Sequence, residues 1–336
     1  MAVLFSKVPD NFASAFGELV YGISGLEQSR VVDAEVLAGA SDVPVGVKRV
    51  VGGGGVAVNI SGYVRRGLAP SPVVPEGMGI TTGNGLSIAA AVSCAEAVSP
   101  VRIFTGAVRG LSEYEAMTVL PPERRIGWDE WDTVSVPVLA GSLSYRWETV
   151  GGAGCSYASE AVAVSHSVAT LAVDMAAVRR MLDEAGADAE SVTGLKVSLL
   201  AGQEAVVSLE YEICRPPAGA VRLCWFNSMG GFDFHTFGAS ETEILDAGKE
   251  VFLSHDGYRT ACVQSERRSE LVSGYMPRLW VEGLSGIAAS PLVWRVDGEG
   301  YTPVDVSSGA SAIRRGGLNC VSVTTRDAVP PLRQNF

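Results

Sequence analysis

The chain has 336 residues, enough for about two domains of ordinary size or for one large all-β domain. With 26 Lys and Arg against 37 Asp and Glu, its net charge is −11, which argues against nucleic acid as a partner because an acidic surface repels phosphate. The chain is 47% hydrophobic and contains 39 glycines, which argues against a disordered protein and favours many turns between short strands.

The N-terminal residues do not match a secretory signal, because the apolar run is short and has no basic start. The most apolar later window, 161–173, is interrupted by His166 and is shorter than the roughly 18 residues that a membrane-spanning helix needs. Six cysteines are dispersed without a CxxC pair, so we expect reduced thiols and no zinc site. The sequence therefore predicts a soluble protein made in the cytoplasm, with no membrane partner.

Alternation of apolar and polar residues predicts antiparallel strands along most of the chain. It is clearest at 207–213, where every second residue is apolar and the residues between are Ser or Glu. Similar runs occur at 18–25, 31–37, 45–51, 56–66, 86–93, 101–108, 133–139, 162–173, 195–200, 220–226, 292–296 and 318–324.

Gly52–Gly55, followed by Val56 and Ala57, matches the glycine spacing of a dinucleotide-binding loop. That site needs a helix directly after the loop, because the first amides of the helix hold the pyrophosphate. The β-branched and aromatic residues that follow predict a strand instead. We therefore expect an open hairpin loop here and no nucleotide cofactor.

The segment 120–131 opens with two prolines, is charged and lacks periodicity, so we interpret it as a long connection. We accordingly predict an N-terminal β domain over 1–140 and a C-terminal β-sandwich-like domain over 141–336. Two sandwiches that share strands would produce the same pattern.

One segment has helical spacing. Asp174 is a suitable N-cap, Gly186 a suitable stop, and the apolar residues between them are Met175, Val178, Met181, Leu182 and Ala185. This predicts one short α-helix over about 174–185 in a mainly β fold, with its apolar side on a sheet.

The most distinctive segment is 214–237. It predicts a strand over 221–226, a tight turn and a second, aromatic strand. Asn227 tolerates left-handed backbone angles, and Gly230 and Gly231 allow positive φ. Aromatic residues would bury a cluster around the turn: Trp225, Phe232, Phe234 and Phe237.

These residues also carry a resemblance. The pattern Trp225-Phe-Asn227-x-x-Gly230-Gly231-Phe-Asp233-x-x-x-Phe237 resembles a segment of uncharacterised structural proteins of tailed phages and prophages, particularly those of Bacteroidetes-type hosts. Two shorter pieces, 58–65 and 290–306, are similar to other elements of that family. Phe232 and His235 depart from it, standing where Trp and another aromatic residue are frequent.

The resemblance implies a β-rich virion subunit of the tail, connector or baseplate region, made in the bacterial host cytoplasm. Its expected partners are further copies of itself, in a ring or tube that would bury strand edges, and other virion structural proteins. The acidic charge favours a surface position over one that lines DNA. No catalytic residue, metal ligand or cofactor is carried over, and we expect no enzymatic activity.

Two alternatives belong to other classes. The first is a carbohydrate- or cell-surface-binding β-sandwich module, in which Trp128 and Trp131 are candidate sugar-stacking residues. The second is a hydrolase that uses paired carboxylates, or one of the three histidines His166, His235 and His255. The sequence contains no GxSxG, HExxH or P-loop motif to support this second alternative.

Overall fold

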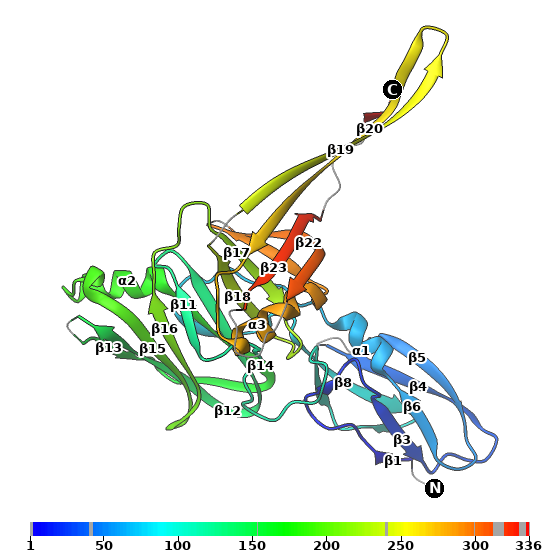
Figure 1. Ribbon diagram of the computed structural model, residues 1–336. Helices are drawn as coiled ribbons and strands as arrows, with labels where there is room; N and C mark the ends of the chain where they lie inside the picture. Colours follow the sequence, from blue (N-terminus) through cyan, green and yellow to red (C-terminus); the bar gives the residue numbers. More distant parts are fainter. Residues whose placement is uncertain are drawn as a thin grey trace. The chain divides into compact units, whose positions relative to one another are not determined.

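The computed structural model describes residues 3–39, 43–152, 154–238, 241–298, 300–311, 319–328 and 334–335. Strands account for 54% of the structure and helices for 11%, so the predicted mainly β fold is confirmed (Figure 1). No helix in these ranges is long and apolar enough to cross a membrane.

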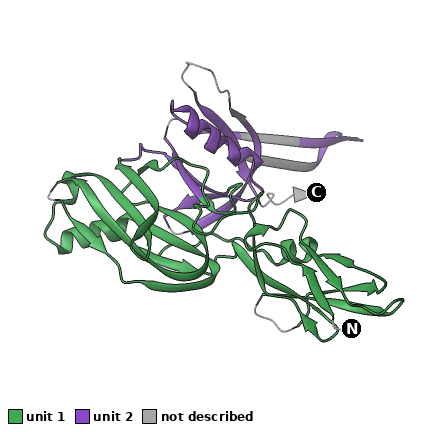
Figure 2. Cartoon of the chain, turned by 90° about the horizontal axis from the view of Figure 1, so that it is seen from below, with its two compact units in different colours: residues 1–213, 227–232 green, residues 214–226, 233–336 purple. Residues whose placement is uncertain are grey.

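The chain forms two compact units, coloured separately in Figure 2. Unit 1 comprises 1–213 and 227–232, and unit 2 comprises 214–226 and 233–336. This partition differs from the division predicted near residue 140. That position lies inside β12 (Trp131–Gly151), an uninterrupted strand of 21 residues.

The N-terminal part of unit 1 contains two sheets. Sheet A is antiparallel and consists of β1 (Leu4–Lys7), β3 (Val20–Ser24) and β6 (Val56–Asn59). Sheet B has the order β2 (Ala13–Ser14), β10 (Arg102–Thr105), β8 (Ser87–Cys94), β4 (Val31–Ala38) and β5 (Gly46–Val51), and β9 (Ala97–Val98) pairs with β8.

Sheets A and B share one hydrophobic core. Sheet A contributes Tyr21, Ile23 and Val58, and sheet B contributes Val36, Val92 and Phe104, all almost inaccessible to solvent. Two sheets that bury facing side chains in this way form a β-sandwich.

Sheet C makes up the rest of unit 1. Its order is β11 (Glu123–Ile126), β16 (Glu204–Ile213), β15 (Val192–Ala201), β12, β14 (Val162–Asp174) and β7 (Gly79–Thr82), and β13 (Ser156–Ala158) pairs with β12. The long strand β12 holds this sheet together, because β14 pairs with its residues 131–143 and β15 with its residues 143–151.

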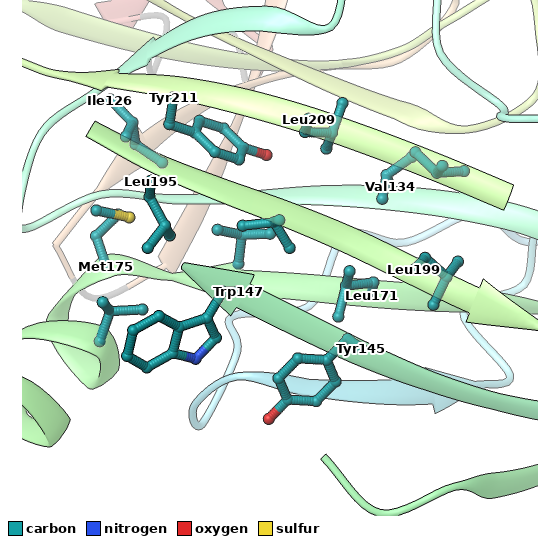
Figure 3. Packing of buried hydrophobic residues seen from close by; sticks show 14 of the residues in the cluster. Ile126, Val134, Tyr145, Trp147, Leu171, Met175, Leu195, Leu199, Leu209 and Tyr211 are labelled. Atoms are coloured by element: carbon teal, nitrogen blue, oxygen red, sulfur yellow. The ribbon is translucent and has the colours of Figure 1, made fainter. Parts of the chain in front are cut away.

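The largest hydrophobic core lies on sheet C and α2 (Met175–Glu184), and Figure 3 shows it at close range. In β16, Val207, Leu209 and Tyr211 are buried while the residues between them are exposed, so the predicted alternation is confirmed. Figure 3 shows Leu209 and Tyr211 in the same core as Trp147 and Met175.

The predicted helix is confirmed by α2. Asp174 ends β14 and caps the helix, since its Oδ1 accepts hydrogen bonds from Ala176 N at 3.0 Å and Ala177 N at 3.2 Å. Gly186 follows with φ +71°. A 3-10 turn, η1 (Ala189–Ser191), then leads into β15.

The structure corrects the predicted strand over 56–66. The strand β6 ends at Asn59, whose Oδ1 accepts a hydrogen bond from Ser61 N at 3.0 Å, and α1 (Ser61–Gly67) follows. Ile60 and Val64 are fully buried four positions apart, which fits a helix as well as it fits a strand.

The loop at Gly52–Gly55 is also corrected. We expected a hairpin, but β5 pairs with β4 in sheet B and β6 pairs with β3 in sheet A. The glycines therefore carry the chain from one sheet of the sandwich to the other.

The expected connection over 120–131 contains a strand. Residues 123–126 form β11, which pairs in parallel with β16 and buries Arg124 and Ile126. The sequence did not reveal this strand because its partner lies 87 residues later in the chain and one inward residue is charged.

Unit 2 is built on sheet D. Its order is β18 (Phe232–Phe237), β17 (Val221–Phe226), β21 (Val293–Asp297), β22 (Gly300–Ser311), β23 (Val321–Asp327), β20 (Gly257–Val272) and β19 (Glu241–Ser254), and β24 (Gln334–Asn335) pairs with β20. Its helical elements are α3 (Arg278–Ser285) and η2 (Gly286–Ala289).

Candidate functional site

The distinctive motif forms the predicted hairpin of β17 and β18. Its turn, 227–232, belongs to unit 1, whereas the remainder of both strands belongs to unit 2. The chain therefore passes between the units at this motif.

Asn227 organises the turn with its side chain. Its Oδ1 accepts hydrogen bonds from Met229 N at 2.8 Å and Gly231 N at 3.3 Å, and its Nδ2 donates to Met117 O at 3.1 Å. The positive φ that the sequence allows at the glycines occurs at Gly230, where φ is +76°, whereas Asn227 and Gly231 do not adopt left-handed angles. Asn227 therefore acts as a buried amide that closes the turn on itself and bonds it to Met117.

Both glycines are required by close packing within unit 1. A Cβ on Gly230 would lie 2.6 Å from Ala107 N, and one on Gly231 would lie 2.1 Å from Met117 O. Ser228 O also accepts a hydrogen bond from Val108 N at 2.9 Å. The turn is thus seated directly against two backbone segments, where side chains have no room.

The other motif residues are interior as well. Trp225, Asp233 and Phe237 are all buried, and so is Phe232, which departs from the phage pattern. His235 is half-buried in unit 2, with its ring 4.9 Å from that of Phe237 and 5.7 Å from that of Trp280. These side chains therefore pack inside the protein and hold the hairpin in place, and they are not presented to a ligand.

A second polar centre, which the sequence did not indicate, is formed by side chains from strands of sheet C. Arg124 Nη1 donates to Asp132 Oδ2 at 2.6 Å, and both side chains are almost fully buried. Arg124 also donates to Thr118 Oγ1 and Pro121 O, and Asp132 also accepts from Tyr211 OH and Thr133 N. This network is buried and extensively hydrogen-bonded, so it is suited to holding β11, β12 and β16 together rather than to proton transfer.

The candidate sugar-binding tryptophans lie in and beside the β11–β12 connection. Trp131 begins β12 and is only 8% exposed. Trp128 is half-buried against the core, and the Arg179 guanidinium lies 5.9 Å from the centre of its ring. The burial of Trp131 counts against a role as a stacking platform, because sugar stacking needs an accessible ring face.

Two buried tyrosines, Tyr21 and Tyr145, have raised pKa values. Burial raises the pKa of Tyr21 and of Tyr145 to about 12, because the phenolate is poorly solvated in the core. Tyr145 OH donates to Met78 O at 3.2 Å. Both hydroxyls therefore remain protonated at neutral pH.

The remaining titratable groups are dispersed. His166 and His255 are exposed, and no three His, Cys, Asp or Glu side chains gather in metal-binding positions within the part of the chain that the structure describes. These groups do not define a reaction centre in the described ranges.

The described residues also include an exposed apolar feature that the sequence did not indicate. It is the hairpin of β19 and β20, whose end carries the exposed residues Val251, Phe252, Leu253 and Tyr258. Asp256-Gly257 between apolar residues is a hairpin signal that could have revealed it. We call residues 251–260 the hairpin tip.

A comparison with protein-family models and a search of curated proteins both find no match to this chain.

Proposed function

We propose that the chain is a structural subunit of a phage or phage-like particle, in the tail, connector or baseplate region, and that it acts by assembling with copies of itself and with other virion proteins. The observation that carries the assembly role is the exposed apolar hairpin tip. Apolar side chains gathered at the end of a projecting element are typical of a contact surface.

The placement in a particle is supported by the sequence resemblance. The strongest element of the resemblance is the turn motif at 225–237. In the folded chain this turn is buried, and its glycines are packed so closely that a side chain would not fit. A motif that maintains packing is compatible with a structural protein, whose residues need to preserve shape rather than chemistry.

The fold supports the assembly role in a second way. Among the described strands, β5 and β19 each lie at the end of a sheet with one edge unpaired. Unpaired edges invite pairing with another chain, and ordered assembly removes that hazard by covering them.

The test is to purify particles from cells that express the chain. Mass spectrometry should detect the chain in the particle band of a density gradient, and antibody labelling in electron microscopy should place it at one structure of the particle. A chain that remains entirely in the soluble fraction, while the particles form without it, would refute the proposal.

A further inference from the structure

We draw no further inference here: the strongest candidate, the exposed apolar hairpin tip at the end of β19 and β20, carries nothing beyond the assembly role already proposed, because nothing in the structure shows what covers it.

Discussion

The turn at Gly230 permits a prediction whose magnitude follows from the structure. In Gly230→Ala, the backbone keeps φ at +76°, a conformation that costs an L-residue about 1–2 kcal/mol. The new Cβ would also lie 2.6 Å from Ala107 N and 2.9 Å from Gly106 C, and such overpacking costs about 1–3 kcal/mol. We expect a total loss of about 2–5 kcal/mol, a large part of the stability of an ordinary domain.

Two matched substitutions separate these contributions. Gly202 has φ +62° with nothing within 4 Å of its missing Cβ, so Gly202→Ala tests backbone strain alone. Gly231 is not in the left-handed region, but its Cβ would lie 2.1 Å from Met117 O, so Gly231→Ala tests overlap alone. Gly230→Ala should therefore be more damaging than Gly202→Ala.

The assays are thermal unfolding and amide hydrogen exchange read by mass spectrometry. The melting temperature of Gly230→Ala should fall by roughly 2–4 °C for each kcal/mol lost. Peptides that cover 106–117 should exchange faster, because the turn must move away from those backbone segments. If Gly230→Ala and Gly202→Ala melt together and exchange at 106–117 is unchanged, close packing is not the reason for glycine at this turn.

Three further predictions concern unit 1. Asp132→Asn leaves the buried Arg124 guanidinium without its counter-charge and should cost about 3–5 kcal/mol in denaturant unfolding, whereas Tyr211→Phe removes one hydrogen bond and should cost about 1 kcal/mol. Asp174→Ala removes the N-cap of α2 and should cost about 1 kcal/mol, measured as a lower melting temperature. The pKa of Tyr145 is about 12 in the folded chain against a usual 10.0, so at alkaline pH unfolding releases its proton. The free energy of unfolding should therefore be unaffected below pH 10 and should fall by about 2 kcal/mol towards pH 11.5. Tyr145→Phe should remove this loss.

Each of these predictions has a control. Equal losses from Asp132→Asn and Tyr211→Phe would contradict the importance of the buried charge. Asp183→Ala, at an exposed position in the same helix, should leave the melting temperature unchanged; a drop equal to that of Asp174→Ala would show that capping is not the cause. Parallel pH profiles for Tyr145→Phe and the native chain would show that Tyr145 does not carry the alkaline loss.

Features that depend on neighbours in the sequence were predictable from it. The alternation at 207–213 yields β16 with the expected residues inside, because side chains on a strand point to opposite faces whatever the strand pairs with. Asp174 and Gly186 bound α2 because caps satisfy backbone groups of the adjacent turn. The hairpin around Asn227, with its buried aromatic residues, follows from local turn chemistry in the same way.

Features that depend on distant partners were decided only by the tertiary structure. Ile60 and Val64 suit either a strand or a helix, and the core shared by sheets A and B selects the helix. Arg124 is charged, yet it is buried because Asp132 and Tyr211 approach from other strands. The need for glycine at 230 and 231 likewise comes from Ala107 and Met117, more than a hundred residues earlier in the chain. A sequence pattern gives the periodicity and the chemistry of one segment. Whether a residue of that segment is buried depends on which other segment packs against it in the folded chain.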